Sequence, residues 1–202
     1  MSFESLVSGV YQAFQKHAAD ARVILLHARS RYRTALISRL LSDPQIRVFY
    51  YALGAEDVDV ESFIAGFTHD LAEQVPTFGA HVNQVGLGDL KDLTPLLNAF
   101  VKDLNELSDE PYLLLLDEFD RADIADDLQT FLEALVGVLP PQCRLVINSR
   151  QLPRLPWMSS LLTTCSTPSI RSVNVTAKRS CSSLATLPIS QATPSSYLTP
   201  TR

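Results

Sequence analysis

Four short runs of apolar residues give the sequence the pattern of a buried parallel sheet. These runs lie within residues 22–26, 46–51, 112–120 and 143–148. The third is continuously apolar from Tyr112 to Leu116, which is typical of a strand that is buried on both faces. We predict four β-strands at these positions.

Helical periodicity fills the segments around these runs. Apolar residues recur at spacings of three and four, which indicates amphipathic helices, over residues 2–18, 36–41, 60–75, 93–107 and 128–136. Strands that alternate with helices predict right-handed crossovers and an α/β fold with a parallel sheet flanked by helices. Residues 76–91 contain three glycines and no long periodic run, so we predict a loop with a solvated His81. Asp126 and Asp127 lie near the start of the last helix, where carboxylates favour the helix dipole.

The composition narrows the class of protein. With 202 residues, 46% of them hydrophobic, the chain can bury the core of one domain. A net charge of −5 argues against a protein that binds nucleic acid mainly by electrostatics. The three cysteines have no CxxC spacing, so neither a zinc site nor a disulfide framework is indicated. No apolar run approaches the roughly 18 residues of a membrane span, and the N-terminus lacks a signal-peptide pattern. We therefore expect a soluble, cytoplasmic protein.

A break in composition near residue 158 divides the chain in two. Residues 159–202 contain 19 Ser or Thr, no acidic residue and no glycine. This tail carries a charge of +4, which leaves −9 for residues 1–158. Its regularly spaced apolar residues are too few to offset the entropy cost of ordering it. We predict one folded domain over residues 1–158 and a disordered tail over residues 159–202.

Two adjacent carboxylates, Asp117 and Glu118, end the third run. The carboxyl ends of parallel strands form the sheet edge at which ligands bind. At this edge Asp117 would hold a Mg²⁺ ion, and Glu118 would polarise a water molecule for attack on a phosphate. Alternatively, the pair is solvated at the end of the strand or caps the next helix.

A loop rich in arginine joins the first strand to the next helix. Strand, tight loop and helix form the context of a phosphate-binding loop, whose backbone N–H groups cradle phosphates. The segment His-Ala-Arg-Ser-Arg-Tyr-Arg-Thr, residues 27–34, resembles the Walker A loop of MalT-like ATPases. These are P-loop regulators of the STAND class, often joined to LuxR-type DNA-binding domains. In that family the stretch reads roughly Ala-Pro-Ala-Gly-Tyr-Gly-Lys-Thr-Thr-Leu.

The resemblance assigns a role to each position of this loop. Ser30 and Tyr32 stand where the family has glycines, Arg33 where it has the lysine, and Thr34 where it has the Mg²⁺-binding hydroxyl. Tyr32 brings a bulky ring to a place where glycine lets the backbone approach the phosphates closely. Arg33 can still bind a phosphate through two parallel hydrogen bonds, with Arg29 and Arg31 adding positive charge. Alternatively, the loop is degenerate and no longer binds nucleotide tightly.

The resemblance extends over residues 20–156, with a Walker B segment at 113–118 and a final strand that ends in Asn148-Ser149-Arg150. Arg33 and Asp117 are 84 residues apart, and one extra strand lies between them. Such an insertion is characteristic of the branch of P-loop ATPases that includes the AAA+ proteins. The resemblance implies that Asn148 or Arg150 senses the γ-phosphate of ATP. Alternatively, Asn148 caps the end of the strand and Arg150 pairs with a surface acid.

Three functions follow from these observations. The resemblance implies the ATP-binding switch domain of a signal-transducing transcriptional regulator, with Mg²⁺ as cofactor and weak or absent hydrolysis. The degenerate loop favours instead a nucleotide-independent pseudo-ATPase that acts as a protein–protein interaction module. A third hypothesis is a nucleic-acid patch formed by Arg29, Arg31, Arg33 and Arg39.

The same family implies which partners to expect. Its members continue into a winged-helix segment, a helical repeat sensor and often a helix-turn-helix output domain, none of which is visible in this sequence. We expect protein partners or self-association, contact with DNA only through such an output domain, and no association with a membrane. Because the composition changes abruptly after Met158, our hypothesis is that a frameshift or truncation produced the tail.

Overall fold

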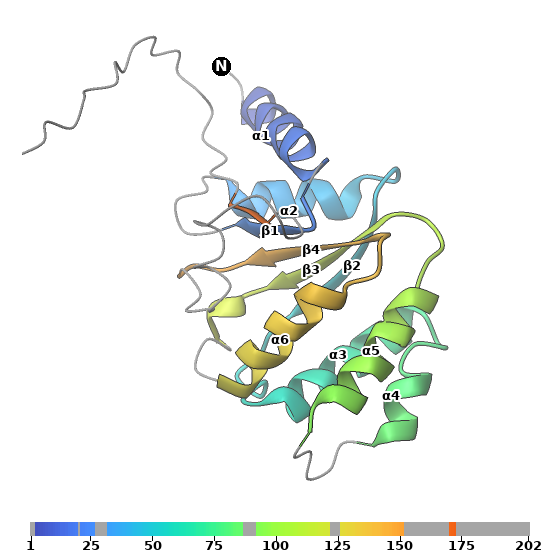
Figure 1. Ribbon diagram of the computed structural model, residues 1–202. Coiled ribbons are helices and arrows are strands. Elements are labelled where there is room, and N and C mark those ends of the chain that lie inside the picture. Colours follow the sequence, from blue (N-terminus) through green and yellow to red (C-terminus); the bar gives the residue numbers. More distant parts are fainter. Residues whose placement is uncertain are drawn as a thin grey trace, which may run out of the picture.

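A parallel β-sheet forms the centre of the computed structural model, which describes residues 3–19, 21–26, 32–86, 92–121, 126–151 and 170–172. The strands are β1 (Val23–Leu26), β2 (Arg47–Ala52), β3 (Tyr112–Asp117), β4 (Cys143–Asn148) and β5 (Ile170–Ser172). Their spatial order is β2-β3-β4-β1-β5, and every neighbouring pair is parallel (Figure 1). The predicted α/β fold and its first four strands are confirmed.

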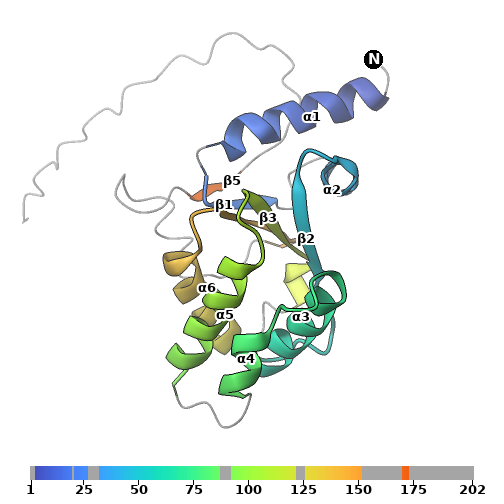
Figure 2. The same cartoon turned by 90° about the vertical axis from the view of Figure 1, so that its right-hand side faces the viewer.

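Helices cover both faces of this sheet. They are α1 (Phe3–Ala18), α2 (Arg33–Ser42), α3 (Val60–Gln74), α4 (Ala80–Val85), α5 (Thr94–Glu106), the 3₁₀ helix η1 (Phe119–Arg121) and α6 (Asp126–Val138). Helices α1 and α2 lie on one face, and α3, α5 and α6 lie on the other, with α4 outermost against α5 (Figure 2). Within the described residues, none of the helices is both long enough and apolar enough to cross a membrane.

Side chains that alternate along the strands build a separate core on each face. Leu114 and Leu116 of β3 belong to the larger core, together with apolar residues of α3, α5 and α6. Leu113 and Leu115 belong to the smaller core beneath α1 and α2. Cys143 is completely buried in the larger core, as expected for a small apolar residue. The two cores fix β3, so the position of its C-terminal end is set by packing on both sides.

A short helix, α4, occupies part of the segment that the sequence predicts as a loop. Its N-terminus is capped by Asp103 of α5, whose carboxylate accepts hydrogen bonds from the backbone N–H of His81 (3.0 Å) and Val82 (2.9 Å). His81 lies in this helix at a partly exposed position, and its Nε2 lies 2.9 Å from Glu106 Oε1. The groups that order this segment belong to another helix, and no local pattern shows them.

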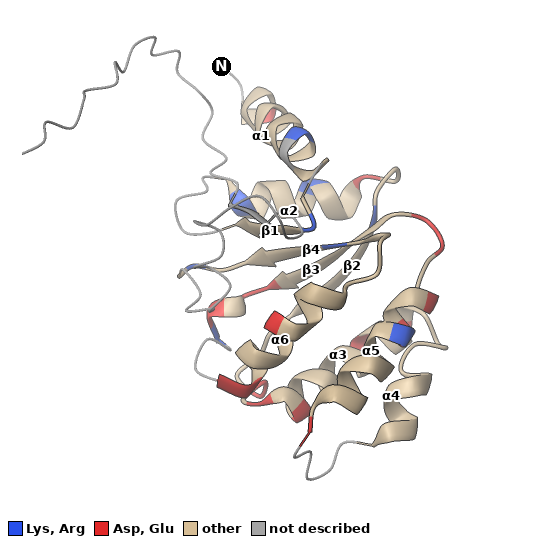
Figure 3. Ribbon diagram, viewed as in Figure 1, with Lys and Arg blue, Asp and Glu red and all other residues tan. Residues whose placement is uncertain are grey.

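The start of α6 is connected to the start of α3. Asp126 and Asp127 are in the first turn of α6, as predicted. Asp127 Oδ2 also accepts a hydrogen bond from the backbone N–H of Val60 (3.0 Å), so it satisfies a free donor at the N-terminus of α3. Asp59 and Ser62 complete a capping box at the same end. Acidic residues therefore gather at the starts of both helices (Figure 3).

A fifth strand lies within the tail that the sequence predicts as disordered. Ile170–Ser172 pair with β1 in parallel register, with Val23 opposite Ile170. These three residues add a strand at the edge of the sheet that β1 would otherwise leave free. The rest of residues 159–202 lies outside the described residues, and the division into a domain and a tail at residue 158 stays a prediction.

Candidate functional site

A pocket of about 240 Å³ lies at the carboxyl edge of the sheet, where α2 begins. Its lining comes from α2, the ends of β3 and β4 and the segments that follow them: Arg33, Thr34, Ile37, Asp117, Glu118, Asp120, Asn148 and Arg150. Six of the predicted site residues thus surround one space, although they come from three separate parts of the chain. Tyr32 directly precedes this group, whereas Ser30 and Arg31 lie outside the described residues.

The strand order explains why these residues meet. Because β4 lies between β1 and β3, the end of β4 is the direct neighbour of the end of β3. The register pairs Leu116 with Ile147, so the next residues of the two strands, Asp117 and Asn148, are neighbours. Strand β1 leads toward α2 from the other side of β4. Two acidic residues, an amide and the start of a helix therefore face one pocket, as is typical of ligand sites in α/β sheets.

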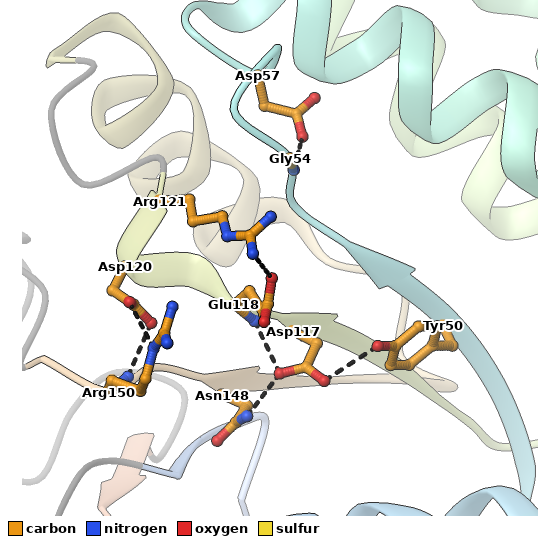
Figure 4. A network of polar contacts seen from close by, with 9 residues as sticks. All are labelled: Tyr50, Gly54, Asp57, Asp117, Glu118, Asp120, Arg121, Asn148 and Arg150. Carbon is orange, nitrogen blue, oxygen red and sulfur yellow. Dashed lines mark hydrogen bonds and ion pairs between the residues drawn. The ribbon is translucent and has the colours of Figure 1, made fainter.

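Asp117 accepts hydrogen bonds from three protein donors (Figure 4). Its Oδ1 accepts from the backbone N–H of Glu118 (2.7 Å) and from Asn148 Nδ2 (2.5 Å). Its Oδ2 accepts from the Tyr50 hydroxyl (3.0 Å). Donors from both neighbouring strands therefore fix the orientation of the carboxylate.

Tyr50 belongs to the site although no sequence pattern singled it out. It lies on β2, half-buried, and Ala52, two residues further along the strand, is the residue paired with Asp117. Burial raises the pKa of the Tyr50 phenol to about 12, and the neighbouring Asp117 carboxylate adds to this shift. The phenol consequently stays protonated and donates its hydrogen bond across the physiological pH range. Its role depends on β2 lying beside β3, which the sequence alone did not show.

Asn148 has one polar atom without a partner. Its Nδ2 donates to Asp117, but its Oδ1 is buried and accepts no hydrogen bond within the described part of the chain. A buried acceptor of this kind costs free energy unless a donor or a cation satisfies it. Because Asn148 lines the pocket, a bound ligand or its water shell can supply the missing partner.

Glu118 is held by both its backbone and its side chain. Its backbone lies in the left-handed region (φ 51°), which non-glycine residues adopt at a cost of about 1 kcal/mol. Its carboxylate forms an ion pair with Arg121, with 2.8 Å between Oε2 and Nη2. Positive φ at this position turns the chain sharply from β3 into η1. The turn leaves Glu118 at the pocket with one carboxylate oxygen engaged by Arg121.

Arg150 pairs with Asp120 at the rim of the pocket. Asp120 accepts from the backbone N–H of Arg150 (2.9 Å) and from its Nε (3.0 Å). Burial tends to raise the pKa of Asp120, but the hydrogen bonds from Arg150 outweigh burial and lower this pKa below its usual value. This pairing agrees with the alternative prediction that Arg150 pairs with an acid. The guanidinium nevertheless lines the pocket and is largely exposed.

The exit of the arginine-rich loop retains a backbone shape that glycine favours. Tyr32 precedes α2 with φ 63° and ψ 25°, in the left-handed region, and its side chain makes no capping hydrogen bond. Its ring contacts Phe3 of α1 edge-on, with 6.3 Å between the ring centroids. The next residue, Arg33, donates from Nη1 to the carbonyl oxygen of Ser149 after β4. Arg33 is therefore fixed at the pocket between α2 and β4.

The donor set fits a Mg²⁺ ion that is held together with a phosphate group. The described residues contain no group of three or more His, Cys, Asp or Glu side chains that could cage a metal. Mg²⁺ usually needs no such cage, because it binds through one or two protein oxygens and takes its other ligands from phosphates and water. Thr34, Asp117 and Asn148 all line the pocket, and the buried Asn148 Oδ1 has no hydrogen-bond partner within the described residues.

Comparison with solved structures identifies a related fold. The chain is similar to a chain in the structure of Drosophila ORC bound to AT-rich DNA and Cdc6, with a TM-score of 0.50 and 11% sequence identity. The match covers 86% of this chain and 57% of that chain, so this chain spans little more than half of its length. The α/β architecture thus resembles the AAA+ fold. No family model and no curated protein matches the sequence, and the resemblance to MalT-like regulators stays a prediction.

Proposed function

We propose that this chain is a nucleotide-binding module of the P-loop type, which binds the triphosphate of ATP together with Mg²⁺. One observation supports this proposal above the others. The pocket at the carboxyl edge of the sheet brings together two arginines, a threonine at the start of a helix, three carboxylates and an amide with an unsatisfied oxygen. Cationic groups and a helix N-terminus favour an anion, whereas the carboxylates favour a cation. A metal–phosphate complex satisfies both.

Each side chain has a distinct task in this proposal. Arg33 and Arg150 contact phosphate oxygens, which planar guanidinium groups bind through paired hydrogen bonds. Thr34 and Asp117 hold the metal through their oxygens, while Asn148 accepts from the water around it. When bound, Mg²⁺ supplies positive charge that offsets the charge of the phosphates. The sequence resemblance assigns further phosphate contacts to Ser30 and Arg31, which lie outside the described residues.

Glu118 is the residue that would position a water molecule, and its surroundings favour slow hydrolysis or none. One of its oxygens is engaged by Arg121, and the guanidinium of Arg150 is engaged by Asp120. Both pairs restrain side chains that would act on a γ-phosphate. A site that binds ATP but hydrolyses it slowly suits a conformational switch, in which nucleotide selects one of two states.

A more specific version of the proposal is that nucleotide binding operates a regulatory switch. The sequence resemblance to MalT-like regulators suggests that nucleotide controls assembly with protein partners or with further copies. Contact with DNA then requires a separate output domain.

A second candidate is a pseudo-ATPase that serves as an interaction module without nucleotide. Two observations favour it. Tyr32 occupies the left-handed position at which glycine lets phosphates approach, and Arg33 already donates to the Ser149 carbonyl. In this reading the carboxylate network around Asp117 is structural, and the module presents its surface to a partner.

Thermal unfolding of the full chain with nucleotide separates the two candidates. A ligand that binds only the folded state at 100 times its Kd stabilises that state by about 2.7 kcal/mol. For a chain of this size, such a gain raises Tm by roughly 5–10 °C. We expect this rise with ATP and Mg²⁺ and a much smaller rise with ATP and EDTA. Equal Tm values with and without ATP and Mg²⁺ would support the pseudo-ATPase.

A further inference from the structure

The hydrogen bonds of Asp117 leave one direction open for a cation. An ionised carboxylate offers about four lone-pair sites, two on each oxygen. Oδ1 uses both of its sites, for the Glu118 N–H and for Asn148 Nδ2. Oδ2 uses one, for the Tyr50 hydroxyl, within the described part of the chain. The oxygen that can still bind a metal or its water shell is therefore Oδ2, the oxygen that Tyr50 contacts.

Tyr50 is placed to set the direction of this free lone pair. Tyr50, Asp117 and Thr34 together line a second, shallow pocket of about 390 Å³ that opens beside the first. Thr34 and Asp117 line both pockets, so Tyr50 stands beside the two residues that would hold the metal. A hydroxyl that holds one lone pair of Oδ2 restricts the other to a single direction. Residues that orient a ligand in this way commonly change metal affinity by 10–100-fold.

We propose that Tyr50 is a positioning residue for Mg²⁺, which acts by orienting Asp117 Oδ2 toward the ion. This inference rests on the proposed binding of ATP and Mg²⁺ and adds to it a residue outside the phosphate loop and the acidic end of β3. Tyr50 itself touches neither the nucleotide nor the ion. Its removal should weaken the metal step and leave the contacts between protein and phosphate intact.

The adjacent residue supplies a matched control. Tyr51 is on the same strand and donates a hydrogen bond of the same kind, from its hydroxyl to Asp57 Oδ1 (2.8 Å). It points to the opposite face of the sheet, where it is buried in the larger core. Tyr51→Phe therefore removes a phenol-to-carboxylate bond of equal type on the face of the sheet opposite to the Tyr50 hydroxyl. Any effect that is specific to the metal must separate Tyr50→Phe from Tyr51→Phe.

The experiment measures ATP binding by the full chain over a series of free Mg²⁺ concentrations and in EDTA. Wild type, Tyr50→Phe and Tyr51→Phe are compared after circular dichroism has shown that all three are folded. We expect Tyr50→Phe to raise the Mg²⁺ concentration at half-saturation about tenfold. ATP binding in EDTA should be the same for Tyr50→Phe and wild type. Tyr51→Phe should lower stability without moving the Mg²⁺ midpoint.

Fluorine NMR of protein that carries fluorotyrosine gives a second readout. The Tyr50 resonance is identified by its absence from the Tyr50→Phe spectrum. It should shift when Mg²⁺ is added to the ATP-bound protein, because the hydroxyl shares Oδ2 with the ion.

Three results would overturn the inference, and they differ in what they say of the proposed function. If Tyr50→Phe has the same Mg²⁺ midpoint as wild type, the inference about Tyr50 is overturned, and the proposed binding of ATP and Mg²⁺ is unaffected. Equal weakening of ATP binding in EDTA and in Mg²⁺ also overturns it, because Tyr50 would then act on the nucleotide or the fold. No Mg²⁺-dependent binding by folded wild type overturns both.

Discussion

Asn148 on β4 donates a hydrogen bond to Asp117 on β3 over 2.5 Å, across 31 positions of sequence. This contact joins the ends of two neighbouring strands and brings an amide into the same pocket as three carboxylates. It also leaves Asn148 Oδ1 buried without a partner within the described residues. The contact thus contributes to the fold and to the candidate site at once, and its two contributions can be separated by mutation.

Asn148→Ala should destabilise the protein by about 1.5–3 kcal/mol, because it removes a hydrogen bond to an ionised group in a half-buried setting. Asn105→Ala is the control, since Asn105 Nδ2 donates to the backbone of its own helix at an exposed position. Urea unfolding measures both. If Asn148→Ala lowers the free energy of unfolding no more than Asn105→Ala does, the contact between Asn148 and Asp117 does not stabilise the fold. If the unsatisfied Oδ1 serves a ligand, Asn148→Ala should also weaken the binding of ATP and Mg²⁺.

The pairing of Asp120 with Arg150 predicts a pH dependence of stability. The pKa of Asp120 is lowered in the folded state from its ordinary value of 3.8. A lowered folded pKa stabilises the protein at pH values above 3.8, and this contribution is lost as the pH falls through the lowered pKa. Asp120→Asn should therefore cost about 1 kcal/mol near neutral pH and progressively less below about pH 4. Urea unfolding at several pH values checks this, with Asp109→Asn as control. A cost that does not change with pH would argue against the pairing.

Gly66 and Tyr51 should be energetically coupled. A Cβ added at Gly66 would collide with the Tyr51 hydroxyl, which donates to the buried Asp57. Gly66→Ala alone should cost about 1–3 kcal/mol, because it displaces a donor from a buried carboxylate. In a Tyr51→Phe background the hydroxyl is gone, so the same change should cost at least 1 kcal/mol less. A double-mutant cycle by urea unfolding measures this coupling. Additive effects would show that the two residues do not interact.

Restoring the phosphate loop should strengthen nucleotide binding. Tyr32 holds a left-handed conformation that glycine adopts freely, so Tyr32→Gly preserves the backbone while removing the ring. Together with Arg33→Lys it should tighten the binding of ATP and Mg²⁺ roughly tenfold, or about 1.4 kcal/mol. Isothermal titration calorimetry against wild type measures the gain, with Arg39→Lys as a control for the lysine. Equal affinity would mean that the loop departures do not limit binding.

Burial should make Cys143 unreactive in the native protein. The pKa of its thiol is raised to about 12, because the buried site disfavours the thiolate. In a Cys165→Ser/Cys181→Ser background, we expect Ellman's reagent to modify Cys143 only as fast as the protein unfolds. Rapid modification under native conditions would place Cys143 at the surface instead.

The sequence pattern predicted much of the fold, because the positions of the helices and strands depend on local periodicity. The continuous apolar run before Asp117 is typical of a strand buried on both faces, and the final run ended at Asn148 as observed. Both positions lie at carboxyl ends of parallel strands, so Asp117 and Asn148 could be assigned to one edge without coordinates.

The sequence pattern could not show the features that depend on contacts between distant segments. Tyr50 becomes part of the site only because β2 lies beside β3, and α4 is ordered by Asp103 of another helix. Asp120 pairs with Arg150 across 30 positions, which no spacing rule indicates. The roles proposed for Thr34, Glu118 and Arg33 stay predictions, because the structure shows their proximity and not their ligand.

Equilibrium binding of ATP and Mg²⁺ to the full chain tests the central claim most directly. Wild type is compared with Arg33→Ala and Thr34→Val. Arg47→Ala and Thr130→Val are the matched controls, because these two side chains lie outside the pocket. We predict roughly micromolar binding, or about −8 kcal/mol, that both site variants weaken at least tenfold and neither control changes. No binding by the folded wild type at millimolar ATP would contradict the account and leave the interaction module as the better description.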